Sequence, residues 1–248
     1  MSTPVLGDRE IVSQTGLSTM RARALMFFPA VSGVLLVVLL VGFAKTFFLR
    51  TLFDVPPIPG YLYVHGSVLT AWYVLVFTQT CLVAAQRTDL HRRLGIAAVA
   101  VASLVVPISA FVIVRYVPRG FARGRTLDFV RGLVVGDSLD LVLFVVLVAA
   151  GVYFRRKPDV HKRLMIISCF AIYGPVLARF EIYYGLRVPD PFLVLLPLCV
   201  LGIYDFVVLR REHRATMWIA VLVLVVWAPV YRLLIGSGLP DAFITAVR

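Results

Sequence analysis

The stretch LGIAAVAVASLVVPISAFVIV (residues 94–114) decides the fold, because it carries no charged side chain over a length that crosses a bilayer. A helix needs about 20 apolar residues to span a hydrocarbon core of about 30 Å. Only helices and closed barrels can satisfy every backbone hydrogen bond in lipid. Barrel strands alternate apolar and polar residues, whereas this run is continuously apolar, so it predicts a transmembrane helix.

Six further apolar runs lie along the chain, separated by segments that contain proline or several arginines. We therefore predict an all-α, polytopic membrane helix bundle with about seven transmembrane helices. Residues 1–20 are expected to form a polar N-terminal tail, and residues 21–248 a single transmembrane domain. The expected spans are about 25–48, 61–85, 94–116, 129–154, 164–185, 192–209 and 216–235.

Composition supports this class and excludes others. The chain is 60% hydrophobic and 15% charged, which leaves no room for a separate soluble domain. Its net charge of +12 lies mostly in short loops, where it predicts contact with anionic lipid headgroups rather than with nucleic acid. The three cysteines are isolated within apolar runs, without a CxxC motif, and are interpreted as packing residues.

The arginines and lysines also predict an orientation. They are more numerous in the tail and in the second, fourth and sixth connections than on the opposite side. Because cytoplasmic loops carry the excess of positive charge, we expect a cytoplasmic N-terminus and an outer C-terminus. The basic segment 115–125 on the opposite side weakens this bias.

An internal repeat is the most specific pattern in the chain. DLHRRLGI (residues 89–96) and DVHKRLMI (residues 159–166) share five of eight residues at an offset of 70. Each copy lies in a connection between two apolar runs. The second and third helices are therefore predicted to form a hairpin that the fourth and fifth helices repeat in parallel orientation, as in some transporters.

The second run carries a polar and aromatic stripe. His65, Trp72 and Gln79 are spaced by seven residues and share one helical face, which is expected to turn toward the bundle. His65 is interpreted as a ligand, a base or an axial haem ligand, or else as a hydrogen-bonded residue at the membrane interface.

The fourth run holds two carboxylates, Asp137 and Asp140, which lie three residues apart on one face. A carboxylate at this depth is costly unless it is protonated or paired, and Arg131, Arg179 and His65 are the expected partners. Two readings stay open, a structural ion pair between helices and a proton relay or substrate-binding carboxylate. With Arg179 and Glu181 from the fifth run, they define a candidate polar site in the outer half of the bundle: His65, Asp137, Asp140, Arg179 and Glu181.

The repeated turns place His91 and His161 at equivalent positions. Two such imidazoles could bind a metal ion or haem. Alternatively the motif is structural, since its aspartates cap the following helices and its basic residues fix the topology. Asp205, near the end of the sixth run, is expected to pair with Arg210 or Arg211.

Several of these motifs resemble an uncharacterised bacterial family of multi-pass membrane proteins. They are VHG followed by TAW (residues 64–66 and 70–72), LHRRLG (residues 90–95) and HKRLM (residues 161–165). The resemblance covers most of the chain from Phe43 onward and implies a bacterial inner-membrane location, but no activity. Histidines at helix ends in paired hairpins are distantly similar to four-helix b-type cytochromes, although His65 lacks a second histidine at its depth.

Three hypotheses for the function stay open. The protein is a membrane redox protein or enzyme with a small-ligand, cofactor or proton site, a proton-coupled transporter, or an accessory subunit with membrane-protein partners. HExxH, P-loop and GxSxG motifs are absent from the sequence, and no lysine in the seventh run could hold retinal. The sequence does not identify catalytic residues. It does not identify a cofactor either, although haem and a metal ion are candidates.

Overall fold

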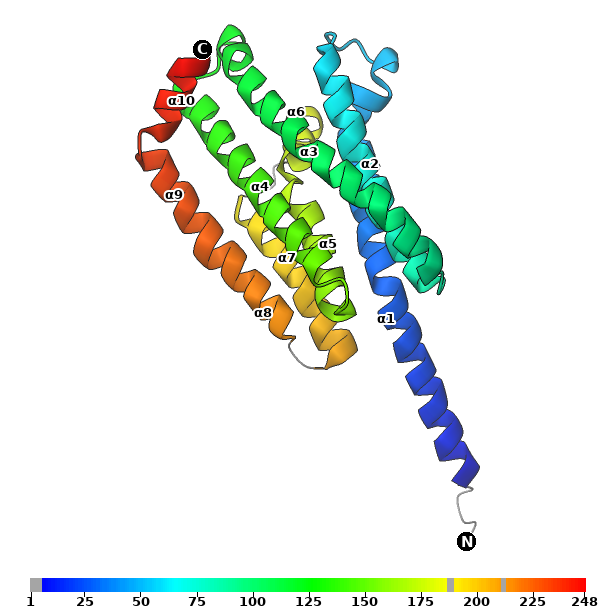
Figure 1. Cartoon of the computed structure of the whole chain (residues 1–248). Coiled ribbons are helices and arrows are strands. Elements are labelled where there is room, and N and C mark those ends of the chain that lie inside the picture. The colour runs from blue at the N-terminus through cyan, green and yellow to red at the C-terminus, as the bar shows by residue number, and fades with distance from the viewer. Residues whose placement is uncertain (1–5, 187–189, 211–212) are drawn as a thin grey trace.

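A computed structural model describes residues 6–186, 190–210 and 213–248. These residues form helices joined by short connections, without a strand among them (Figure 1). The elements are α1 (Leu6–Gly42), η1 (Ala44–Phe48), η2 (Arg50–Leu52), α2 (Gly60–Ala84), α3 (Thr88–Ala122), α4 (Leu127–Tyr153), α5 (Pro158–Ala171), α6 (Gly174–Tyr184), α7 (Asp190–Tyr204), η3 (Asp205–Leu209), α8 (Arg214–Val221), η4 (Leu222–Trp227), α9 (Ala228–Gly236) and α10 (Leu239–Val247). The prediction of an all-α chain is confirmed for this part of the sequence.

Five of the described helical stretches are long and apolar enough to cross a membrane. They are Ala24–Gly42, Gly60–Ala84, Thr88–Ala122, Leu127–Tyr153 and Arg214–Gly236. The pair α5 and α6 adds a sixth if it is counted as one span bent by 41°. The sixth expected run forms only a shorter apolar helix, Leu195–Val208, within the described residues.

The two chain ends differ from the sequence expectation. The segment expected as a polar tail is helical from Leu6 onward and continues into the first span, because no proline interrupts it before Pro29. At the other end, Gly238 has a positive φ of 70° that turns the chain into α10, a short helix that hydropathy did not predict.

The helices pack mainly as sequential neighbours (Figure 1). α2 packs against α3 and α4 against α5, while α1 lies along α2 and α3 lies along α4. We name the two ends of the bundle as they are drawn in Figure 1. The lower end holds the connections 85–87 and 154–157 and the start of α8, and the upper end holds segment 43–59, the connection 123–126 and α10.

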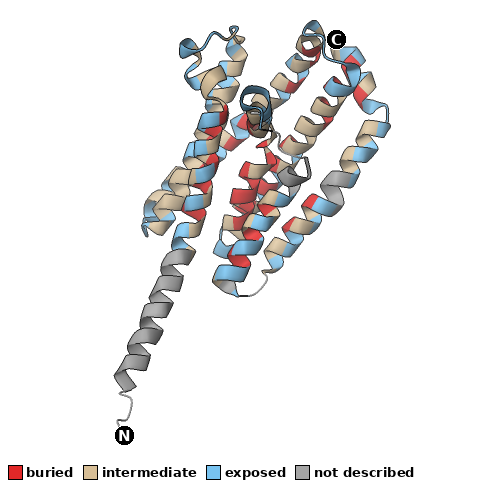
Figure 2. Cartoon of the chain, turned by 180° about the vertical axis from the view of Figure 1, so that it is seen from behind, coloured by how far each residue is buried: buried red, intermediate tan, exposed pale blue. Residues whose placement is uncertain are grey.

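The core lies where α2, α4 and α5 face one another, and Figure 2 shows these buried positions in red. Trp72 is fully buried, with its ring 5.2 Å from that of Phe144 in an edge-to-face contact. The Tyr73 hydroxyl donates a hydrogen bond of 2.7 Å to the Cys169 carbonyl oxygen on α5. The outer faces keep many large apolar side chains exposed, as a lipid-facing surface requires.

A buried polar network joins three segments at the lower end. Arg163 on α5 forms an ion pair with Asp205 on η3, and their side chains are 0% and 4% exposed. Thr216 on α8 donates to the Asp205 carboxylate at 2.6 Å and accepts from Arg163 Nε at 3.1 Å. Asp205 therefore pairs with Arg163, whereas the sequence suggested Arg210 or Arg211, and Arg211 lies outside the described residues.

The N-cap of α8 is part of the same network. The backbone N–H of His213 donates to Asp205 at 3.1 Å, and His213 Nδ1 accepts from the Ala215 N–H at 3.1 Å. Burial, together with the nearby Arg163 charge, holds the pKa of His213 below its usual range. The neutral ring is thus the form that caps the helix, since a protonated Nδ1 could not accept this hydrogen bond.

Candidate functional site

Asp137 and Asp140 project from one face of α4, as their spacing predicts. α4 begins with Thr126 as its N-cap, whose hydroxyl accepts from the Phe129 N–H at 3.3 Å. From this start, Asp137 lies roughly 15 Å along the helix at about 1.5 Å per residue. The structure therefore carries these carboxylates well inside a helix of membrane-spanning length.

Asp140 lies beside a break in the neighbouring helix. The chain leaves helical geometry between α5 and α6, where Pro175 cannot donate a backbone hydrogen bond to the preceding turn. A Cβ added to Gly174, the first residue of α6, would lie 3.7 Å from the Asp140 carboxylate. Tyr73 on α2 is close enough to interact electrostatically with Asp140. A carboxylate thus borders the interrupted part of a bent span.

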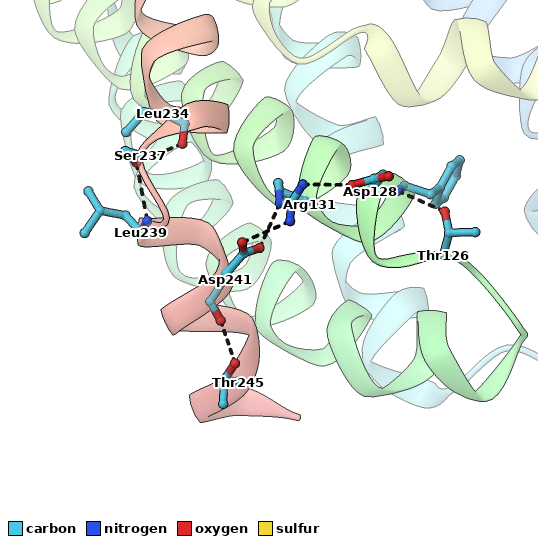
Figure 3. A network of polar contacts seen from close by, with 9 residues as sticks. Thr126, Asp128, Arg131, Leu234, Ser237, Leu239, Asp241 and Thr245 are labelled. Carbon is cyan, nitrogen blue, oxygen red and sulfur yellow. Dashed lines mark hydrogen bonds and ion pairs between the residues drawn. The ribbon is translucent and has the colours of Figure 1, made fainter.

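Asp137 lacks the ion pair expected for it. No hydrogen bond or ion pair joins its carboxylate to Arg131, Arg179 or His65 within the described part of the chain. Arg131 instead contacts Asp241 on α10, with Nε and Nη2 donating at 2.8 and 2.9 Å (Figure 3). Asp137 therefore holds its carboxylate beside the bundle interior without a cation bound to it.

Arg179 on α6 is a second charged side chain of this region that forms no ion pair with the described residues. Its guanidinium lies 5.1 Å from the centre of the Phe43 ring, and its Nε is buried without a hydrogen-bond partner. Arg119 on α3 and Arg123, the residue just after this helix, are close enough to repel it. A buried guanidinium in a positive field is unfavourable unless an anion neutralises it, so this corner of the upper half favours negative ligands.

Tyr116 on α3 connects the two charges and was not singled out from the sequence. It lies within electrostatic range of both Asp137 and Arg179. It also precedes Arg119 by three residues, which puts the two on one face of α3, and Arg123 is the residue that follows the end of this helix. That spacing is a signal that sequence analysis could have used.

The other two residues of the candidate site lie at its margins. His65 on α2 is half-buried, and its Nδ1 has no hydrogen-bond partner among the described atoms. Glu181 on α6 is exposed. Tyr116 is in electrostatic range of Asp137 and Arg179, and Asp140 lies at the break. No contact between His65 and these residues is found within the described part of the chain.

The turn histidines meet at the lower end, far from this group. The rings of His91 on α3 and His161 on α5 have centroids 6.2 Å apart and planes at 84°. His161 Nδ1 donates to the Gly151 carbonyl oxygen at 2.8 Å. Gln79 on α2 donates to the His91 carbonyl oxygen at 3.1 Å. Among the described residues, no group of three or more His, Cys, Asp or Glu side chains could hold a metal ion.

Comparisons with known proteins give no match for this chain, whether with protein-family models, curated proteins or solved structures.

Proposed function

We propose that this protein is an integral membrane protein that moves a small anionic solute across the bilayer together with a proton. The site is the upper-half group of Asp137, Asp140, Tyr116 and Arg179. Five helices of spanning length, the bent pair α5 and α6, and the shorter apolar helix Leu195–Val208 together support a bundle of seven spans. The excess of basic residues at the lower end favours a cytoplasmic N-terminus.

The observation that carries this proposal is the position of Asp140 at the break between α5 and α6. Interrupted helices inside a membrane leave backbone groups free to bind ligands, and many transporters place their substrate sites there. Ionisable side chains at this depth serve proton movement and substrate binding in such proteins. Asp137, on the same face and without an ion pair to any described residue, is the residue that we assign to the proton.

Arg179 supplies the preference for anions. Its buried Nε has no hydrogen-bond partner among the described residues, and Arg119 and Arg123 add positive charge nearby. A carboxylate or phosphate group would satisfy the guanidinium through charge-assisted hydrogen bonds. Tyr116, which interacts electrostatically with both Arg179 and Asp137, would then respond to both the solute and the proton.

The internal repeat supports a transporter architecture. α2 with α3 and α4 with α5 are consecutive helix pairs, and the repeated turns bring His91 and His161 together at the lower end. An axis along the membrane normal between these turns would relate the two pairs, and parallel repeats of this kind occur in transporters. By resemblance of motifs, the membrane is the bacterial inner membrane.

The experiment uses purified full-length protein in vesicles that enclose a pH-sensitive dye. Gradients of phosphate, sulfate, acetate and succinate are applied in turn, and acidification of the lumen is recorded. The wild type should acidify the lumen with at least one anion. Asp137→Asn should abolish the acidification, and Arg179→Gln should raise the anion concentration needed for half-maximal rate.

Asp128→Asn is the matched control, because Asp128 lies on the same helix but is 87% exposed. It should transport like the wild type. Acidification no faster than in protein-free vesicles, or unchanged in Asp137→Asn, would count against proton-coupled transport. The accessory-subunit hypothesis would then be favoured if a second membrane protein co-purifies.

A further inference from the structure

The two turn histidines serve no purpose in the proposed transport site, which lies in the opposite half of the bundle. We infer that His91 and His161 bind one late first-row transition-metal ion between their rings. The site would lie at the lower end, where the two repeated turns meet, and its existence does not depend on the transport proposal. Imidazole is a preferred ligand of zinc and copper ions.

The separation of the rings fits a shared metal ion. A ring nitrogen lies about 1.1 Å from the centre of an imidazole, and its bond to the metal is about 2.0–2.1 Å. Two imidazoles in a linear nitrogen–metal–nitrogen arrangement, such as Cu⁺ accepts, therefore have centroids about 6.3 Å apart, whereas a tetrahedral arrangement would bring them to about 5 Å. The observed separation of 6.2 Å fits the linear arrangement. The angle of 84° between the planes is compatible with this, since rotation about the metal–nitrogen axis leaves coordination unchanged.

The proton on His161 is also placed for metal binding. Its Nδ1 contacts the Gly151 carbonyl oxygen at 2.8 Å, and a carbonyl can only accept, so Nδ1 carries the hydrogen. In the neutral ring the lone pair is then on Nε2. Metal-binding histidines are commonly oriented in this way by a backbone carbonyl. Glycine at position 151 lets Met165 of α5 pack closely against α4, because a Cβ there would lie 2.6 Å from Met165 Sδ.

Two unsatisfied atoms border the histidine pair. Nδ1 of His91 and Oε1 of Gln79 are both buried without a hydrogen-bond partner, and the Gln79 amide already contacts the backbone of His91. A cation would stabilise the amide oxygen of Gln79, directly or through water. The nearest turn carboxylates are engaged elsewhere, Asp89 with Arg87 and Asp159 with Lys162. With few protein ligands, the ion would keep positions open for water or an exchangeable ligand.

The chain offers matched controls because it has four histidines. Purified protein in detergent is stripped with a chelator and equilibrated with Zn²⁺ or, under reducing conditions, Cu⁺, and bound metal is measured by mass spectrometry. We expect one ion per chain. His91→Ala and His161→Ala should each weaken binding at least tenfold, whereas His65→Ala and His213→Ala should bind as the wild type does.

A measurement on the wild-type protein tests the proposal even if the variants fail to fold. Nitrogen NMR of histidine-labelled protein should show metal-dependent shifts for two ring nitrogens and not for the other histidines. Wild-type protein that binds neither ion, or loss of binding that is equal in all four variants, would overturn the proposal. A haem absorbance band that disappears in the His91 and His161 variants would also overturn it and assign the pair to haem iron.

Discussion

Asp205→Asn should destabilise the protein far more than its conservative chemistry suggests. Asp205 accepts from Arg163, Thr216 and the His213 N–H with two carboxylate oxygens. Asparagine has only one acceptor oxygen, and its NH₂ group replaces the second carboxylate oxygen. This NH₂ group would face hydrogen-bond donors and could not accept from them. The substitution therefore removes at least one charged hydrogen bond and leaves the Arg163 guanidinium buried without a counter-ion.

The expected loss follows from burial. The two side chains are 0% and 4% exposed, so water cannot replace the lost partner. Breaking a buried ion pair from one side typically costs about 3–5 kcal/mol. A change of 1 kcal/mol shifts the unfolding temperature by about 2–4 °C at this chain length, which predicts a decrease of roughly 6–20 °C.

Thermal unfolding in detergent, followed by far-UV circular dichroism, measures this decrease. Asp89→Asn is the control, since Asp89 and its partner Arg87 are 59% and 58% exposed and an exposed pair contributes at most about 1 kcal/mol. The double variant Arg163→Met with Asp205→Asn should lose less stability than the sum of the single variants, because the two residues interact directly. An Asp205→Asn shift no larger than that of the control would refute the reasoning.

Three further predictions concern other regions. Lowering the pH from about 6.5 should decrease the free energy of unfolding, because His213 has a lowered pKa and the unfolded chain binds its proton more readily. His213→Asn, which caps the helix without titrating, should reduce this dependence in pH-resolved melts. Gly66→Ala should destabilise by about 1–3 kcal/mol through overpacking, since its Cβ would lie 2.6 Å from an aromatic carbon; Gly60→Ala, with open space around it, should show no such loss in the same melts. Asp241→Asn should release α10 from Arg131, which hydrogen exchange would detect as faster amide exchange in residues 239–247 with α4 unchanged.

The sequence predicts where the helices lie better than it predicts which side chains contact one another. Long apolar runs predict spans because the bilayer sets their length, and this worked for the run around Leu127–Tyr153. It was less informative for 164–185, where Pro175 accompanies a bend that hydropathy does not register. The same limit applied to α10, whose nine residues are too few to produce a membrane signal.

Pairing was harder to predict because it depends on tertiary packing. Arg131 was expected near Asp137, but its partner Asp241 lies 110 residues away on a helix that was not foreseen. The contact between the two turn histidines, in contrast, has a signal in the sequence, because both histidines belong to similar turn motifs. The polar residues of the candidate site were identified individually, and Tyr116 was missed because a single tyrosine in an apolar run is unremarkable by composition.

The Arg163–Asp205 pair also has a consequence for biosynthesis. Asp205 follows Arg163 by 42 residues, so Arg163 is synthesised before its counter-ion. At about 5–20 residues per second, this interval lasts roughly 2–8 s. Meanwhile the nascent helix carries an arginine that only water, lipid phosphate or the insertion machinery can neutralise. Docking of α5 at the lower end is thereby completed only when η3 arrives, and a chain that ends between Arg163 and Asp205 would leave Arg163 without this counter-ion.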